Sequence, residues 1–346
     1  MKHQTTRYGE IPFYKIGTFD NTADAFISKK LFLEYKTKYS FPKKGDILIS
    51  ASGTIGRAVI YDGKPAYFQD SNIVWIDNDE TLVKNDFLFY AYSNVKWNTE
   101  HTTILRLYND NFRNTLIPLP PLNEQNAIAN ILSALDRYLC TLDALILKKE
   151  GVKKALSFEL LSQRKRLKGF NQAWQRVRLG DIANYLTSNL SVEQITQQGK
   201  IKVYDANNFI GYTDTTFISD KPYISIIKDG SVGRVRILPP KTNILSTMGA
   251  LIANHRTTTE FLFYLLSNFD FKNFTSGSII PHIYFKDYKE KTIFLPSLNE
   301  QIAIANILSA LDKEIASLKN KKRQFENIKK ALNHDLMSAK IRVLKK

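Results

Sequence analysis

The chain has 346 residues, a formal net charge of +16 and a single cysteine, Cys140. This length suggests two domains, and a hydrophobic content of 43% argues against a disordered chain. One cysteine excludes an intrachain disulfide and a thiolate metal cage, and five scattered histidines argue against a zinc enzyme.

The N-terminal segment predicts neither export nor membrane insertion. Its first seven residues contain no apolar signal-peptide region, and no run in the chain approaches the ~18–20 apolar residues of a membrane span. We therefore expect a cytoplasmic protein with no membrane partner. In such a protein a large positive charge favours a polyanionic partner, most simply nucleic acid. An ordinary solvated basic surface is the alternative that charge alone leaves open.

The first variable block has the pattern of a mixed α/β domain. Segments rich in β-branched and aromatic residues predict short strands at 46–49, 58–61 and 73–76. An apolar pattern of helical period predicts a helix at 86–92. A Gly-x-x-Gly-Arg motif at 53–57 falls between the first two strands and predicts a turn.

A nearly identical segment occurs twice in the chain. Residues 119–137 (LPPLNEQNAIANILSALDR) and 295–313 (LPSLNEQIAIANILSALDK) agree at sixteen of nineteen positions, at an offset of 176. Such a long period indicates a duplicated domain. Each copy opens with proline followed by Asn-Glu-Gln, which predicts a helix start that Asn123 or Asn299 can cap. In the second copy Ser297 and Glu300 also have the spacing of a capping box, so a start one or two residues earlier is the alternative.

Each repeated segment predicts the beginning of a long helix with one apolar stripe. The apolar residues recur at alternating three- and four-residue spacings over about 43 residues, which is typical of a coiled-coil seam. Because such a helix needs a partner stripe, the simplest closure packs the two helices against each other, as a rod between two globular blocks. The alternative is that each stripe serves another subunit.

The second variable block repeats the pattern of the first. Three strands and one helix are predicted, at 201–204, 223–227, 235–238 and 260–266. A second Gly-x-x-Gly-Arg motif, at 230–234, again falls between strands. The predicted fold class is therefore α+β, with two mixed α/β domains separated by two long helices in a pseudo-twofold internal repeat.

The sequence offers no catalytic motif. It lacks the phosphate loop of P-loop ATPases, a Gly-x-Gly-x-x-Gly helix start and the Pro-Pro-aromatic tetrapeptide of amino-methyltransferases. Its carboxylates show no metal-site spacing. We therefore predict a binding protein that is not an enzyme and has no catalytic residue, metal or cofactor of its own.

Positive charge is concentrated in two segments. Residues 148–178 and 319–346 each hold ten Lys and Arg against two acidic residues. Both segments lie along the later half of a repeat helix and just beyond it. A solvated coiled-coil flank explains this pattern, and so does a basic face that contacts DNA phosphates or an acidic subunit.

Two kinds of segment are candidates for DNA contact. The glycine turns present backbone N–H groups and an arginine, which suit a phosphate or a guanine edge, although ordinary turns with a solvated arginine have the same pattern. Polar loops containing aromatic residues, at 102–108 and 275–284, precede the repeats, and plain surface loops are again the alternative. The predicted DNA-binding residues are Gly53, Thr54, Arg57, Thr103, Arg106, Tyr108, Ser231, Arg234, Ser276, Ser278, His282, Tyr284 and Lys286.

Together these features resemble the specificity subunit of type I restriction-modification systems. The resemblance is carried by the two Leu-Pro-(Pro/Ser)-Leu-Asn-Glu-Gln helix starts, the long striped helices, the glycine turns and residues 174–182 (WQRVRLGDI). It implies a non-catalytic DNA-reading subunit in which each block is a target recognition domain for one half of a split target. It also implies that the long helices form an antiparallel coiled coil that fixes the distance between the halves.

The resemblance further implies protein partners. Two adenine-methylating modification subunits dock on the helices, and motor-nuclease restriction subunits join them, so S-adenosylmethionine and ATP belong to these partners. The predicted partner-binding residues are those of the two helix starts, Asn123, Glu124, Gln125, Asn299, Glu300 and Gln301.

The implied organisation has four segments. Residues 1–118 and 169–294 are the recognition domains, and residues 119–168 and 295–346 are the helical regions. The first recognition domain has no counterpart of residues 174–182 and is predicted to be N-terminally short. The alternative from a different class is a stand-alone sequence-specific DNA-binding or scaffold protein that dimerises through its long helices.

Overall fold

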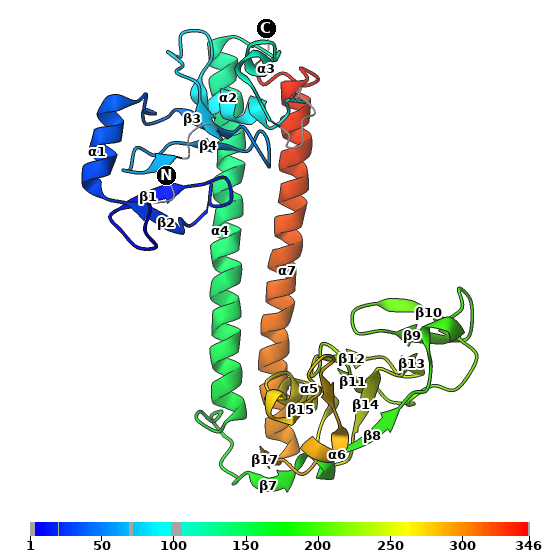
Figure 1. The fold of residues 1–346 in the computed structure, drawn as a ribbon. Coiled ribbons are helices and arrows are strands. Elements are labelled where there is room, and N and C mark those ends of the chain that lie inside the picture. The colour runs from blue at the N-terminus through cyan, green and yellow to red at the C-terminus, as the bar shows by residue number, and fades with distance from the viewer. Residues whose placement is uncertain (1–3, 20, 69–71, 98–105, 345–346) are drawn as a thin grey trace. The chain divides into compact units, whose positions relative to one another are not determined.

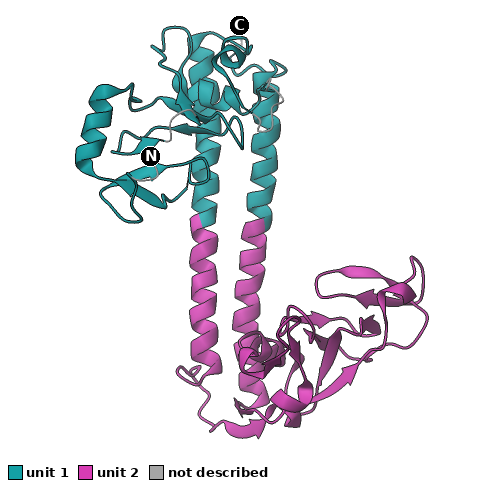
Figure 2. Ribbon diagram, in the orientation of Figure 1, with its two compact units in different colours: residues 1–143, 320–346 teal, residues 144–319 magenta. Residues whose placement is uncertain are grey.

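The protein divides into two compact units (Figure 2). The computed structural model describes residues 4–19, 21–68, 72–97 and 106–344. Unit 1 consists of residues 1–143 and 320–346, and unit 2 of residues 144–319. Each unit therefore contains part of both long helices. This division follows packing, whereas the four segments predicted from the sequence follow chain order and stay a prediction.

Unit 1 builds its sheets in the orders β2-β1-β5 and β4-β3-β6. Ile47, Leu48 and Ile49 are all buried, as expected for a central strand that is covered on both faces. The elements of its variable block are β1 (Ile11–Tyr14), β2 (Ala25–Ile27), α1 (Lys29–Lys38), β3 (Ile47–Ser50), β4 (Ala58–Ile60), β5 (Tyr67–Phe68), β6 (Ile73–Trp75), α2 (Asn85–Tyr92) and α3 (Asn109–Arg113) (Figure 1).

Unit 2 contains a sheet of order β12-β11-β14-β8, a sheet of order β10-β9-β13 and the pairs β17-β7 and β15-β16. Its core includes the buried Phe261 and Leu262 of α5. The elements of its variable block are β7 (Gln175–Arg178), β8 (Ala183–Thr187), β9 (Ile201–Tyr204), β10 (Phe209–Thr213), β11 (Tyr223–Ile227), β12 (Val235–Leu238), β13 (Thr242–Ile244), β14 (Met248–Ala253), α5 (Thr259–Ser267), β15 (Thr275–Ser276), β16 (His282–Ile283), α6 (Phe285–Tyr288) and β17 (Thr292–Leu295).

The strands and short helices predicted from the sequence are confirmed to within a residue or so. The three strands predicted in the second block are β9, β11 and β12, and the three in the first block are β3, β4 and β6. The two predicted short helices are α2 and α5. The glycine turns connect β3 to β4 and β11 to β12, as expected. Mixed helices and sheets in a repeated arrangement confirm the predicted α+β class.

The two long helices are α4 (Leu122–Leu161) and α7 (Leu298–Met337), of 40 residues each. Both begin one residue before the asparagine, so the predicted asparagine cap is wrong. In α7 the helix follows Ser297, the alternative start, whose carbonyl accepts a 2.9 Å hydrogen bond from the N–H of Gln301. In α4 the carbonyl of Pro121 accepts hydrogen bonds from the backbone N–H groups of Glu124 and Gln125, at 2.9 and 3.0 Å. Among the described residues, no helix combines the length and the apolar character that crossing a membrane requires.

Within each unit, the parts of α4 and α7 pack in opposite directions. In unit 2, Lys149 pairs with Glu314, and Lys153, further along α4, pairs with Asp312, which lies earlier on α7. The buried residues of the predicted stripe include Ile128, Leu132, Leu142, Ile304, Leu308, Ile315 and Leu336. Others, Ile131, Val152 and Ile328, are exposed, because a seam between two helices leaves part of each stripe outside.

One carboxylate joins three helices of unit 1. Asp136 of α4 accepts a 2.8 Å hydrogen bond from the hydroxyl of Tyr90 on α2, and the same carboxylate pairs with Lys329 of α7. The ammonium of Lys329 also lies 5.6 Å from the centre of the Tyr90 ring. Burial, followed by the bond to Asp136, raises the pKa of Tyr90, so its hydroxyl stays a hydrogen-bond donor at neutral pH.

Unit 2 repeats this network with the roles of the long helices exchanged. Asp312 of α7 accepts a 2.8 Å hydrogen bond from the hydroxyl of Tyr264 on α5 and pairs with Lys153 of α4. Burial and the bond to Asp312 again raise the pKa of the tyrosine. In both units the network therefore fixes the helix of the variable block to both long helices.

The Asp312→Ala substitution tests the network of unit 2. It leaves Tyr264 and Lys153 without their shared acceptor, so we expect the free energy of unfolding to fall by about 1–2 kcal/mol, the range for a half-buried hydrogen-bonded pair. Urea unfolding followed by circular dichroism measures the change. The control is Asp220→Ala, which removes an exposed aspartate without a side-chain partner among the described residues. Equal losses in the two variants would contradict the proposed role.

Candidate nucleic-acid interface

The first glycine turn needs both of its glycines. Gly53 and Gly56 adopt φ angles of +69° and +81°, a region that side chains disfavour. At Gly56 a Cβ atom would also lie 2.2 Å from Nε1 of Trp97, so an aromatic ring packs directly on the turn. Thr54 and Arg57 are exposed beside it, although Arg57 donates a 3.1 Å hydrogen bond to the carbonyl of Phe19.

The second glycine turn has the same construction. Gly230 and Gly233 have φ angles of +83° and +82°, and a Cβ atom at Gly233 would lie 2.7 Å from Cδ2 of Phe271. Ser231 and Arg234 are exposed. In each unit the first glycine therefore permits the backbone conformation, and the second also admits an aromatic ring.

The structure places each turn beside the loop that was predicted separately as a DNA contact. In unit 1, Ser52 and Arg106 form an isolated β-bridge, and the N–H of Leu107 donates to the carbonyl of Ala51 at 2.9 Å. Tyr108 follows and is exposed. Thr103 lies outside the described residues.

The matching contact in unit 2 is a β-bridge between Asp229 and His282. The N–H of Gly230 donates to the carbonyl of Pro281, and the N–H of Ile283 to that of Lys228, both at 2.9 Å. The turn and the loop are more than forty residues apart in the sequence, so their contact was not predictable from local patterns.

The loop of unit 2 is a short hairpin. Ser276 of β15 pairs with His282 of β16, and Ser278 is exposed between these strands. Ring stacking links His282 to Tyr284, with centroids 6.4 Å apart, and the ammonium of Lys286 lies 5.5 Å from the Tyr284 ring. These predicted residues therefore form one continuous surface with the second glycine turn.

Sequence reasoning missed two features of this surface. Oδ1 of Asp229 lies 2.6 Å from Nδ1 of His282, which fixes the orientation of the imidazole ring. Ile279 and Ile280, at the tip of the hairpin, are 92% and 55% exposed. An Ile-Ile pair inside a segment of glycine and serine was the available signal for an exposed apolar tip.

Cations without an internal partner line the second turn. Arg234, Lys228 and Lys272 make no side-chain hydrogen bond or ion pair with other described residues. Arg234 and Lys272 border a hollow of about 460 Å³ whose wall includes Phe271. Their charges are therefore available for an anionic partner such as a phosphate backbone.

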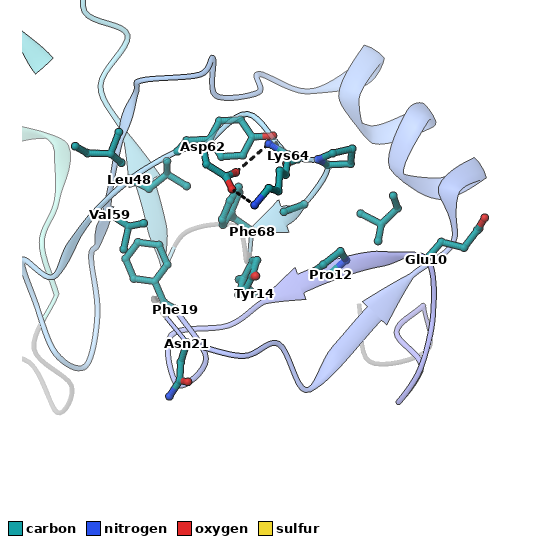
Figure 3. A pocket seen from close by; sticks show the side chains of 15 residues that line it. Glu10, Pro12, Tyr14, Phe19, Asn21, Leu48, Val59, Asp62, Lys64 and Phe68 are labelled. Carbon is teal, nitrogen blue, oxygen red and sulfur yellow. Dashed lines mark hydrogen bonds and ion pairs between the residues drawn. The ribbon is translucent and has the colours of Figure 1, made fainter. Parts of the chain in front are cut away.

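A separate hollow of about 610 Å³ lies in unit 1 (Figure 3). Phe19, Leu48 and Phe68 line it, and Asp62 and Lys64 pair at its wall with Nζ and Oδ2 3.1 Å apart. None of the predicted site residues lines this hollow, and its lining contains no serine, cysteine or histidine. It is therefore not part of the predicted DNA surface.

At the helix starts, four of the six predicted partner-binding side chains are buried and bind other residues of the chain. Gln125 donates to the carbonyls of Leu82 and Pro120, and its Oε1 accepts from the N–H of Lys84. Gln301 likewise binds the backbone of Arg256, Pro296 and Thr258, and the hydroxyl of Thr257. Both side chains are fully buried. They hold the start of each long helix to the variable block.

The two glutamates bind arginines of the segments that follow the long helices. Arg166 donates to both carboxylate oxygens of Glu300, at 3.2 and 2.7 Å, and Nε1 of Trp174 adds a 3.0 Å bond. Arg342 donates to both oxygens of Glu124. This leaves Asn123 and Asn299 as the exposed members of the set, so for the other four residues the structure shows an internal role.

Comparison with known proteins gives the family. The family model of the type I restriction modification DNA specificity domain matches residues 1–149 and 171–327, so the chain belongs to this family. It is 25% identical over 373 residues to the type I restriction enzyme MjaVIII specificity subunit of Methanocaldococcus jannaschii, covering 96% of this chain and 87% of that protein.

Two further matches differ in how much of each chain they cover. A candidate type I restriction enzyme specificity subunit of Haemophilus influenzae is 64% identical over 133 residues, which is 38% of this chain and about a third, 34%, of that protein. The crystal structure of the type I restriction-modification S subunit from M. genitalium has a TM-score of 0.64 at 21% identity, covering 97% of this chain and 91% of that one. It shares the fold.

Arg342→Met tests the internal role of Glu124. The hydrogen bonds from Arg342 hold the pKa of this carboxyl below its ordinary value of 4.5, so the pair stabilises unit 1 above that pH. We expect the variant to have a lower Tm than the parent at pH 7. The difference should shrink as the pH falls below 4.5 and vanish once Glu124 is protonated. Thermal unfolding at several pH values measures it.

The matched control is Arg323→Met, which removes an exposed arginine of α7 in the same unit. It should leave the Tm nearly unchanged at every pH. A Tm deficit of Arg342→Met that persisted undiminished at low pH would show that the lost packing, and not the charge on Glu124, accounts for the effect.

Proposed function

We propose that this chain is a non-catalytic DNA specificity subunit of a type I restriction-modification complex, with one recognition domain for each half of a bipartite target. The observation that carries the proposal is the repeated surface: in both units a glycine turn is bridged to a loop that carries basic and aromatic residues. Two copies of one construction suit two half-targets. Family membership and the surplus of positive charge support the same conclusion.

The residues of each surface divide by chemistry into phosphate and base contacts. Arginine and lysine side chains without internal partners, such as Arg234 and Lys272, suit phosphates, which give affinity without sequence information. His282 suits a base edge, because Asp229 occupies its Nδ1 and leaves Nε2 for a donor or acceptor group. In unit 1 the corresponding contacts are assigned to Arg57, Arg106 and Tyr108.

The long helices are the proposed docking surface for two modification subunits and the element that sets the spacer of the target. Both helix starts expose the same side chains: Leu122 and Leu298 are 39% and 44% exposed, and Asn123 and Asn299 lie beside them. Because the two helix starts expose the same patch, they favour the binding of two molecules of one partner. Methyl transfer, ATP use and DNA cleavage then belong to the modification and restriction subunits.

The alternative is a stand-alone DNA-binding or scaffold protein that dimerises through these helices. Gel filtration of the pure chain distinguishes the two functions. A monomer that recruits modification subunits supports the specificity subunit, and a tight self-dimer that recruits none supports the alternative.

The first prediction of this function concerns methylation. When the chain is co-expressed with a modification subunit of its own system, we expect new N6-methyladenine at a motif of two short parts separated by a fixed gap. Mapping the methylated positions across the host genome measures this. An assembled complex that produced no new methylation would overturn the proposal, and a motif with one defined part would restrict reading to one unit.

The second prediction separates phosphate from base contacts. Arg234→Ala should weaken binding to all DNA sequences about fivefold. It should also reduce the slope of the log binding constant against log salt concentration by about one. His282→Ala should instead relax the preference in one half of the target, by about 1–3 kcal/mol per base. Competition binding at two salt concentrations measures both. Arg176→Ala, an exposed arginine of β7, is the charge-matched control and should have little effect.

A further inference from the structure

The hairpin of β15 and β16 in unit 2 ends in an apolar tip. Its strands pair Thr275 with Ile283 and Ser276 with His282, and residues 277–281 connect them. In this connection Ile279 is 92% exposed and Ile280 55%. Because contact between apolar surface and water is unfavourable, two adjacent isoleucines at the end of a hairpin indicate a surface that becomes buried on binding.

The backbone holds this tip in a defined shape. Gly277 has a φ angle of +91°, and a Cβ atom there would clash with the carbonyl oxygen of Ile280, so the connection closes tightly on itself. The ring of Pro281 fixes the next φ angle, and its carbonyl accepts a 2.9 Å hydrogen bond from the N–H of Gly230. The tip is therefore anchored to the second glycine turn. Since isoleucine is branched at Cβ, its side chain loses little rotational freedom when it is inserted into a partner.

The charges of the hairpin and the turn favour DNA as the partner of this tip. Residues 272–286 contain two lysines and no acidic residue, and the turn, residues 228–234, contains a lysine and an arginine. The one carboxylate of the turn, that of Asp229, is paired with His282. A DNA duplex offers phosphates to the cations and the faces of stacked bases to the isoleucines.

We propose that Ile279 and Ile280 form an apolar wedge that inserts between two adjacent base pairs of the DNA bound by unit 2 and kinks the duplex at that step. This inference rests on the proposed DNA function and adds a contact that makes no hydrogen bond to a base. Unstacking one base step is unfavourable, and burial of the isoleucines and closer contact between cations and phosphates offset it. Because pyrimidine–purine steps unstack most easily, the wedge favours such a step in the half-target of unit 2.

The probes are duplexes that the full chain selects from a random pool, with 2-aminopurine placed at each position in turn and a dye at each end. The fluorescence of 2-aminopurine rises when its neighbours unstack, and energy transfer between the dyes reports the bend. With the parent chain we expect the rise at one step, together with a shorter distance between the ends. A duplex with a mismatch at that step should bind about fivefold more tightly, since it unstacks more easily.

The double variant Ile279→Ser/Ile280→Ser removes the wedge. It should abolish the fluorescence rise and the bend, weaken binding to the intact duplex about tenfold, and bind matched and mismatched duplexes equally. The slope of the log binding constant against log salt concentration should stay unchanged, because the phosphate contacts remain.

Two control variants accompany it. Ile279→Leu/Ile280→Leu keeps an apolar tip and should keep the bend. Ile302→Ser changes an isoleucine of α7 that is 47% exposed and should behave as the parent does. All the substituted side chains are exposed, so the variants should fold, which circular dichroism checks.

The outcomes separate this inference from the function on which it rests. Equal bending and equal fluorescence with the parent and the serine variant would overturn the wedge and leave the DNA function standing. A serine variant that bound and bent DNA normally but no longer bound a modification subunit would make the tip a protein contact, and the wedge would be wrong. Failure of the parent chain to select any duplex would overturn the proposed DNA function, and the wedge with it.

Discussion

Each unit depends on a half-buried carboxylate that holds three helices together. Asp136 and Asp312 each accept a hydrogen bond from a tyrosine of the variable block and pair with a lysine of the other long helix. A variable block that is fixed to both long helices holds the surface proposed to bind DNA in a defined position on those helices. Because the network uses side chains of the repeat and one tyrosine, the loops of the block are free to vary without disturbing it.

Each unit also combines residues from both copies of the repeat. The arginine that binds Glu300 follows α4, and the arginine that binds Glu124 follows α7. Each helix start is therefore completed by the segment that follows the other long helix. The carboxylate of the Asn-Glu-Gln motif has a structural task inside the subunit, and this task alone is enough to require the glutamate in both copies.

Local patterns in the sequence predict the strands, the short helices and the position of the glycine turns, because these depend on residues close together in the chain. The contacts that build the site depend on distant residues: Arg342 lies 218 positions from Glu124, and His282 lies 53 from Asp229. No periodicity encodes such pairs. The exact offset of the repeat was the available signal, since Arg166 and Arg342, like Glu124 and Glu300, are 176 positions apart.

The two units differ in whether they are continuous in the sequence. Unit 2 is one continuous stretch, residues 144–319, whereas unit 1 joins residues 1–143 to residues 320–346. During synthesis the whole of unit 2 emerges from the ribosome before unit 1 has its last part. The first variable block must therefore wait for Lys329 and Arg342, and part of its apolar surface stays uncovered until these residues have been synthesised.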